Sequence, residues 1–187
     1  MASTTSAVEA AKRAAAFAAV DAHVRGVHRY IGIGSGSTVP YAVERIVAQG
    51  TEANRNRWFI PTGFQSRQLI LDGGLNLADI QTCPELDVVI DGADEVDNAL
   101  NLIKGGGACH LQEKVVAFAA KEMIVVADYR KRSKILGTKW TKGIPVEVAP
   151  VAASQVLASL KRLGSVNATI RMAKEKVGPV VTDNGFV

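Results

Sequence analysis

Short apolar segments alternate with segments of helical periodicity along most of this chain, and that alternation limits the folds open to it. The predicted strands are mainly apolar and cover residues 30–33, 58–60, 86–90 and 123–127. The predicted helices cover residues 6–23, 39–48, 64–71 and 110–121. Strands that alternate with helices are typical of a mostly parallel sheet with helices on both faces. We therefore predict an α/β fold.

The pattern changes near residue 145. Residues 146–148, 168–172 and 179–182 have the character of short strands, and residues 152–163 have that of a helix. We predict a Rossmann-like α/β domain over residues 1–144 and a smaller α+β lobe over residues 145–187. The final residues, DNGFV, resemble a turn followed by the start of a strand. We therefore expect the smaller lobe to be truncated at its C-terminus.

Composition excludes several classes of protein. The chain has 22 Lys and Arg against 18 Asp and Glu, a balance that suits an anionic partner but not a nucleic-acid-binding surface. It has no run of the roughly 18 apolar residues that a membrane span requires. The two cysteines are too few and wrongly spaced for a disulfide framework or a zinc site. We predict a cytoplasmic protein with no nucleic-acid or membrane partner.

A glycine- and serine-rich turn, GIGSGST, lies between the first predicted strand and the helix that follows it. Glycines let the backbone approach a ligand closely, and the free N–H groups at the start of a helix bind anions. The spacing differs from the dinucleotide fingerprint GxGxxG, and no P-loop lysine follows. Phosphate or carboxylate binding is the favoured interpretation over a merely tight turn. The residues concerned are Ser35, Gly36, Ser37 and Thr38.

An acidic loop follows the third predicted strand. It reads Asp91-Gly92-Ala93-Asp94-Glu95, and its carboxylates lie where that strand ends, at the edge where open α/β sheets bind ligands. Such a cluster serves as a set of metal ligands or as groups that exchange protons with sugar hydroxyls. The alternative is a solvated loop that caps the next segment. The residues alone do not decide between these possibilities.

A lysine with three glycines behind it, Lys104-Gly105-Gly106-Gly107, precedes a second carboxylate, Glu113. Consecutive glycines expose backbone donors, and an ammonium beside them can stabilise a developing oxyanion. Glu113 falls in the first turns of the predicted helix, where a partly desolvated carboxylate could act as a general base. The alternative role for Glu113 is to interact with the helix dipole.

Taken together, GIGSGST, DGADE, LIKGGGA with its downstream QEK, ADYRKRSK and GPVVTDNG resemble type A ribose-5-phosphate isomerase. The resemblance implies interconversion of D-ribose 5-phosphate and D-ribulose 5-phosphate in the non-oxidative pentose phosphate pathway. It also implies that no metal or organic cofactor takes part, that residues 1–144 form the catalytic domain, and that the protein is a homodimer or homotetramer. The acidic loop would then serve proton transfer rather than metal binding.

The resemblance also assigns roles to residues. Glu113 would be the base that moves a proton between C2 and C1, while Lys104 stabilises the enediolate. Asp91 and Asp94 would assist ring opening and bind hydroxyls. The substrate-binding residues that it implies are Lys12, Ser35, Gly36, Ser37, Thr38, Gly92, Ala93, Gly105, Gly106, Gly107 and Lys131.

Three other interpretations stay open. A similar α/β scaffold occurs in sugar-phosphate-sensing effector domains, which bind a phosphosugar without turning it over. A coenzyme A transferase-like enzyme would use a glutamate as its nucleophile. A sensor needs a phosphate site but no base, so the presence of Lys104 and Glu113 beside the acidic loop favours the isomerase. A shortened and inactive isomerase is the third alternative.

Overall fold

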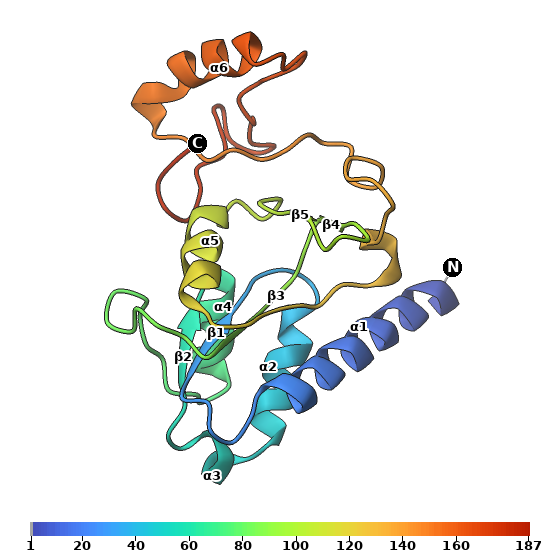
Figure 1. The fold of residues 1–187 in the computed structure, drawn as a ribbon, viewed down its shortest axis with the longest axis vertical. Helices are drawn as coiled ribbons and strands as arrows, with labels where there is room; N and C mark the ends of the chain where they lie inside the picture. The colour runs from blue at the N-terminus through green and yellow to red at the C-terminus, as the bar shows by residue number, and fades with distance from the viewer. Residues whose placement is uncertain (1) are drawn as a thin grey trace.

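The computed structural model describes residues 2–187 and contains a central four-stranded parallel sheet (Figure 1). The strands lie in the order β2-β1-β3-β6. Their bounds are β1 Tyr30–Ile33, β2 Trp58–Pro61, β3 Val88–Asp91 and β6 Met123–Val125. In this register Ile31 of β1 lies opposite Phe59 on one side and Val88 on the other. The prediction of a mostly parallel α/β sheet is confirmed.

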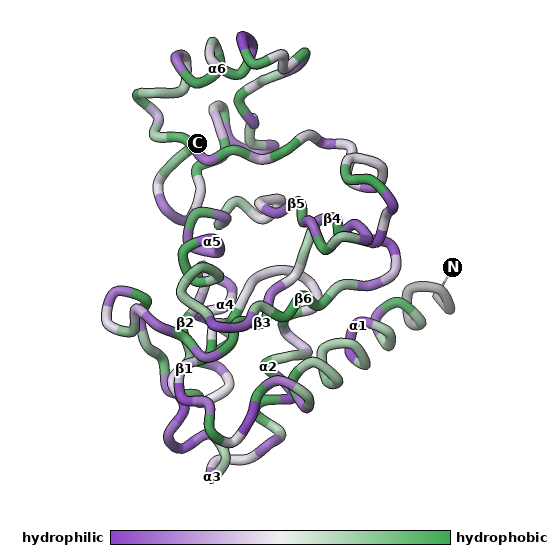
Figure 2. Tube along the Cα trace, in the orientation of Figure 1, coloured by the Kyte–Doolittle hydropathy of each residue, from purple (hydrophilic) through white to green (hydrophobic). Residues whose placement is uncertain are grey.

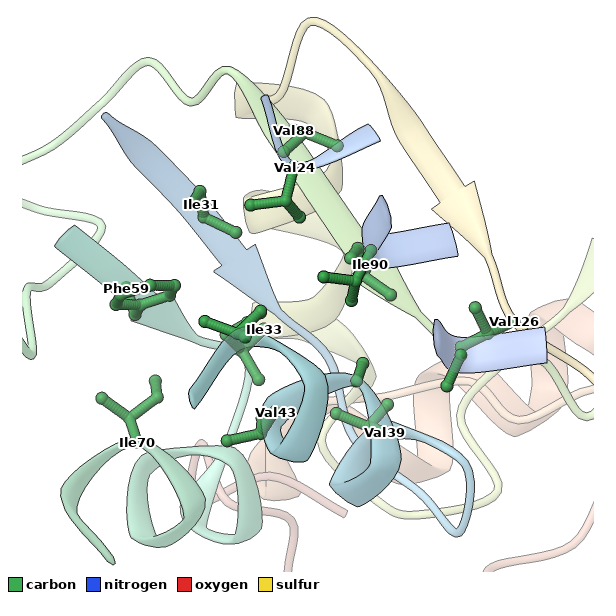
Figure 3. Close-up of a cluster of buried hydrophobic side chains, with 14 residues drawn as sticks. Val24, Ile31, Ile33, Val39, Val43, Phe59, Ile70, Val88, Ile90 and Val126 are labelled. Atoms are coloured by element: carbon green, nitrogen blue, oxygen red, sulfur yellow. The ribbon is translucent and has the colours of Figure 1, made fainter. Parts of the chain in front are cut away.

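Helices cover both faces of the sheet because side chains alternate along each strand. Ile31 and Ile33 point to one face, where they join a buried cluster with residues of α1 Ala2–His23, α2 Val39–Ala48 and α4 Phe64–Asp72 (Figure 3). The opposite face packs against α5.

That helix, α5 His110–Ala119, places the buried Val116 beside Val89 and Ile60. Gly32 of β1 faces the same side, where an added Cβ would lie 2.8 Å from the Val116 side chain. A close approach of helix and strand therefore requires glycine here.

Most predicted elements occur with small shifts at their ends. α1 begins at Ala2, so Ser6 lies inside the helix and not at its N-cap. Asp91 is the last residue of β3 and not the first of the following loop. β6 ends at Val125 and α5 at Ala119, both earlier than expected.

A short antiparallel hairpin was not predicted. It consists of β4 Glu95–Val96 and β5 Leu102–Ile103, with Glu95 opposite Ile103. Strands of this length carry too little periodicity to be seen in a sequence. Three single-turn helices were also missed, for the same reason: α3 Thr51–Asn54, η1 Tyr129–Lys131 and η2 Pro150–Ala152.

The region after residue 145 departs most from expectation. The predicted helix is present as α6 Ala153–Arg162, which carries both hydrophobic and hydrophilic residues (Figure 2). The predicted strands at 146–148, 168–172 and 179–182 are not formed; the described residues there show an isolated bridge between Met172 and Pro179 and a backbone pair between Val148 and Val187. An alternating pattern supplies only a propensity, and a strand also needs a hydrogen-bonding neighbour. A separate domain over residues 145–187 stays a prediction.

Within residues 2–187, none of the helices combines the length and the apolar character that crossing a membrane would demand.

Candidate active site

A pocket of about 110 Å³ lies at the carboxyl ends of β1, β3 and β6. Parallel strands present their carboxyl ends at one edge of the sheet, so loops far apart in the sequence meet there. The residues that line the pocket are Ser35, Gly36, Ser37, Thr38, Gly92, Ala93, Asp94, Lys104, Gly105, Gly106, Gly107, Glu113, Val126, Ala127, Asp128 and Lys131.

The glycine-serine turn forms one wall of this pocket and leads into α2. Its Ser35 N–H donates to Asp91 Oδ1 at 3.0 Å, which joins the turn after β1 to the end of β3. Gly34 permits that approach, because an added Cβ would lie 2.1 Å from Asp91 Oδ1. The pocket also meets the N-terminus of the ten-residue helix α2, and the N–H groups and dipole at such a helix end attract a phosphate. The Gly36 N–H is not free for this purpose, because it donates to Gln65 Oε1 at 2.7 Å.

Lys104 occupies the centre of a buried charged cluster. Its Nζ lies 2.9 Å from Asp91 Oδ2 and 2.9 Å from Glu113 Oε1, and it donates to the Gly92 carbonyl at 2.7 Å. The contact with Asp91 is an ion pair without the angles of a hydrogen bond. Burial lowers the pKa of Lys104, but the two carboxylates outweigh burial and raise it. Lys104 therefore stays protonated at neutral pH.

Glu113 has the environment of a general base. It lies in the first turn of α5, yet its side chain is only slightly exposed and turns toward Lys104 instead of solvent. Burial and the nearby Asp91 charge raise its pKa from 4.5 to about 7, although Lys104 acts in the opposite direction. A carboxylate with a pKa near neutrality can accept and return a proton at physiological pH.

The glycine loop offers backbone donors on the other side of the pocket. The Gly106 N–H donates to Asp94 Oδ2 at 2.7 Å. Among the described residues, none accepts a hydrogen bond from the N–H of Gly105 or Gly107. Two donors of this loop are therefore available to a ligand, while Asp94 holds the third.

The segment after β6 supplies the remaining wall. Lys131, which we predicted to bind substrate, lies in η1 and lines the pocket. Arg130 instead pairs with Asp128, whose carboxylate it contacts at 2.7 Å. Residues 126–128 were missed by sequence reasoning. They could have been found, because they follow a parallel strand next to β3 and therefore reach the same edge of the sheet.

Two of the predicted site residues do not line the pocket. Asp91 is 1% exposed and lies beneath the glycine-serine turn, where it contacts Lys104. Lys12 is also buried, and its Nζ pairs with Glu9 of the same helix at 2.8 Å. Lys12 is thus the one predicted substrate-binding residue that does not line the pocket. Its role in binding stays a prediction.

Within the described part of the chain, no three His, Cys, Asp or Glu side chains are grouped as metal ligands would be. Asp91 and Asp94 have Lys104 and backbone N–H groups as their partners instead.

Comparison with known proteins identifies relatives along nearly the whole chain. The chain is 67% identical over 180 residues to ribose-5-phosphate isomerase of Mycosarcoma maydis, a match that covers 96% of this chain and 63% of that protein. It is 54% identical over 183 residues to the Homo sapiens protein of the same name, with 98% and 58% covered. The chain thus spans about three fifths of the length of these relatives.

Solved structures agree with the sequence matches. Ribose 5-phosphate isomerase A from Methanocaldococcus jannaschii superimposes with a TM-score of 0.85 at 37% identity, covering 95% of this chain and 77% of that one. A D-ribose-5-phosphate isomerase in complex with phospho-erythronic acid gives a TM-score of 0.84 at 34% identity, with 96% and 76% covered. The family model described as ribose 5-phosphate isomerase A (phosphoriboisomerase A) matches residues 58–187. This chain belongs to the ribose 5-phosphate isomerase A family.

Proposed function

We propose that this protein interconverts D-ribose 5-phosphate and D-ribulose 5-phosphate through an enediolate. One observation carries the proposal: the buried carboxylate of Glu113, with its pKa raised to about 7, contacts the Lys104 ammonium at 2.9 Å in a pocket that also meets a helix N-terminus. A base, an oxyanion-stabilising cation and a phosphate site are the three parts that this reaction needs.

The phosphate would bind at Ser35–Thr38, where α2 begins, with Lys131 as its cationic partner. This end of the substrate does not react. Its binding holds the sugar so that the reacting carbons approach Glu113, which lowers the entropic part of the barrier.

The chemical step moves one proton between two neighbouring carbons. Glu113 would take the proton from C2 of the open-chain aldose and return it to C1, while negative charge develops on the sugar oxygens. The Lys104 ammonium and the free amides of Gly105 and Gly107 would stabilise that charge. Asp94, which lines the pocket, would assist ring opening and bind hydroxyls. Asp91 was expected to share this role, but it is buried beneath the pocket and would act through its ion pair with Lys104.

The ligand bound by one relative supports this assignment of the pocket. Phospho-erythronic acid, bound by a D-ribose-5-phosphate isomerase of similar structure, combines a phosphate with a carboxylate and hydroxyls. A carboxylate carries charge where an enediolate would carry it, so the same pocket chemistry suits both.

The test is a coupled assay of ribose 5-phosphate conversion by this chain, with and without EDTA, alongside Glu113→Gln. We expect turnover that EDTA leaves unchanged, a loss of about 10²- to 10⁴-fold in the variant, and retained phosphosugar binding by calorimetry. Glu122→Gln, which removes a carboxylate outside the pocket that pairs with His23, is the control and should keep its rate. Binding without turnover by the unaltered chain would indicate a sensing domain or an inactive shortened isomerase.

Two further expectations belong to this proposal. Homodimeric or homotetrameric assembly follows from the resemblance to the family, and light scattering coupled to gel filtration measures it. A cytoplasmic location is expected from the composition, and fluorescence microscopy of a tagged chain measures that.

A further inference from the structure

Glu95 is a fully buried carboxylate that lies next to the active-site residue Asp94 and has no assigned role. Its two oxygens accept four successive backbone N–H groups. Oε2 accepts from Gly137 at 2.7 Å and Trp140 at 3.2 Å, and Oε1 from Thr138 at 3.1 Å and Lys139 at 2.9 Å.

Hydrogen bonds keep Glu95 ionised inside the protein. Burial alone would raise the pKa of Glu95, but the Lys139 N–H, the Ser133 side chain and the N–H groups of Gly137 and Trp140 outweigh it and lower the pKa to about 2. Residues 137–140 therefore wrap around an anion, as backbone nests do. A neutral side chain of the same size would not organise these N–H groups as effectively, because charge-assisted hydrogen bonds are roughly twice as strong as neutral ones.

The wrapped segment ends in Trp140, which packs against the glycine loop. An added Cβ on Gly106 would lie 2.7 Å from Trp140 Cη2, so the indole edge rests directly on that glycine. The indole Nε1 donates to the Gly143 carbonyl at 2.7 Å, which fixes the plane of the ring. Lys131 Nζ lies 5.9 Å from the ring centroid, within range of a cation–π contact.

Two neighbouring carboxylates thus hold two segments that touch each other. Asp94 accepts a hydrogen bond from the Gly106 N–H, and Glu95 accepts hydrogen bonds from the N–H groups of residues 137–140. The adjacent Val96 carbonyl accepts the Ser133 N–H at 2.9 Å, which ties the chain just after Lys131 to the same hairpin.

We propose that Glu95 is a positioning residue for the phosphosugar pocket. Its buried charge folds residues 137–140 so that Trp140 supports the glycine loop and limits where the Lys131 ammonium can lie. Glu95 does not line the pocket and acts through these two residues. This inference rests on the proposed function for its kinetic consequence, but not for its structural one.

The kinetic test compares Glu95→Gln with Asp97→Asn. Asp97 is the matched control, because it lies in the same hairpin and accepts N–H groups from Ala99 and Asn101, yet does not line the pocket. We expect Glu95→Gln to raise KM for ribose 5-phosphate about tenfold or more, as loss of hydrogen bonds to a charged group implies. We expect kcat to fall as well, because the glycine loop that Trp140 supports carries the oxyanion donors. Asp97→Asn should leave both constants unchanged. Unchanged KM in Glu95→Gln, or equal changes in both variants, would overturn the proposal.

A second measurement follows Trp140 directly and needs no turnover. In a Trp58→Phe background Trp140 is the single tryptophan, and its emission should shift to longer wavelength in Glu95→Gln as the ring loses its contact with Gly106. The emission should stay unchanged in Asp97→Asn. An unshifted spectrum in Glu95→Gln would contradict the positioning role. If the unaltered chain neither binds nor converts ribose 5-phosphate, the proposed function fails, while this spectral result still decides the role of Glu95.

Trp140→Leu covers the case in which Glu95→Gln does not fold. The leucine removes the indole edge from Gly106 and the ring from Lys131 but leaves the Glu95 hydrogen bonds, because Glu95 reaches residue 140 only through its backbone N–H. We expect the same rise in KM and the same fall in kcat as in Glu95→Gln. A wild-type KM in Trp140→Leu would show that the segment does not support the pocket.

Discussion

Lys104 Nζ and Glu113 Oε1 lie 2.9 Å apart, in a cluster where a single ammonium faces two carboxylates. One cation cannot fully compensate two buried anions, so one of them takes up a proton more readily. That excess falls on Glu113, whose pKa is raised to about 7. The imbalance of charge prepares this residue to act as a base near neutral pH.

The pH dependence of turnover should report this carboxyl group. Because Glu113 must be ionised to accept a proton, we expect kcat/KM to rise with pH and level off above an apparent pKa of about 7. Steady-state rates between pH 5 and 9, in buffers of constant ionic strength, measure it. A profile that is flat across this range would rule out Glu113 as the titrating base.

Stability should depend on pH in the opposite sense. Folding raises the pKa of Glu113 from 4.5 to about 7. The protonated carboxyl group therefore contributes stability that is fully present below pH 4.5 and is lost as the pH rises through about 7. Glu113→Gln removes that dependence. Urea unfolding at pH 4 and pH 8 should therefore show the variant gaining stability relative to the unaltered chain at the higher pH. A constant difference between the two proteins would contradict the raised pKa.

Removing the ammonium should slow the reaction and shift its pH profile. We expect Lys104→Met to lower kcat by about 10²- to 10³-fold, the size of effect found when one oxyanion donor is lost. The apparent pKa of the base should also move upward, because Lys104 lowers the pKa of Glu113. Lys114→Met is the control, since Lys114 is exposed and packs over Phe118. A lower apparent pKa in Lys104→Met would reverse the electrostatic assignment.

Lys131 should act on binding more than on chemistry. It lines the pocket with the α2 N-terminus but has no contact with Glu113. Lys131→Ala should raise KM by about tenfold with little change in kcat, as expected for a group that binds substrate and transition state alike. Lys134→Ala removes an exposed lysine of the same basic run outside the pocket and should change neither constant. A fall in kcat at constant KM would place Lys131 in the chemical step.

Glu147 should couple the C-terminal segment to the helix that carries Glu113. Its Oε2 accepts the Leu111 N–H at 2.7 Å, and its Oε1 accepts from the Asn184 side chain at 3.0 Å and from the Thr182 hydroxyl. We expect Glu147→Gln to lower the free energy of unfolding by about 1.5–3 kcal/mol, the range for hydrogen bonds to a charged group. Urea titration measures it, with the exposed Glu175→Gln as the control. Equal stability of the two variants would show that this docking contributes nothing.

Some outcomes were predictable because they depend on local pattern. The four parallel strands and most of the helices follow from the alternation of apolar segments, and Asp91 could be placed at a strand end from its neighbours alone. The prediction of strands after residue 145 was wrong. Alternating apolar and polar residues give a segment only a propensity for strand, and a strand forms only where a neighbouring strand can pair with it. The hairpin at β4 and β5 was missed because its strands are too short to show a period.

The amino-acid sequence by itself determined the parallel sheet and the edge at which its polar loops gather, because apolar periodicity and strand direction are local properties. Only the tertiary structure decided which charges meet. It turned Glu113 toward Lys104, paired Lys12 with Glu9, and buried Glu95 under the backbone of residues 137–140. Side-chain direction and burial depend on how distant loops pack together, and those contacts leave no periodic signal along the chain.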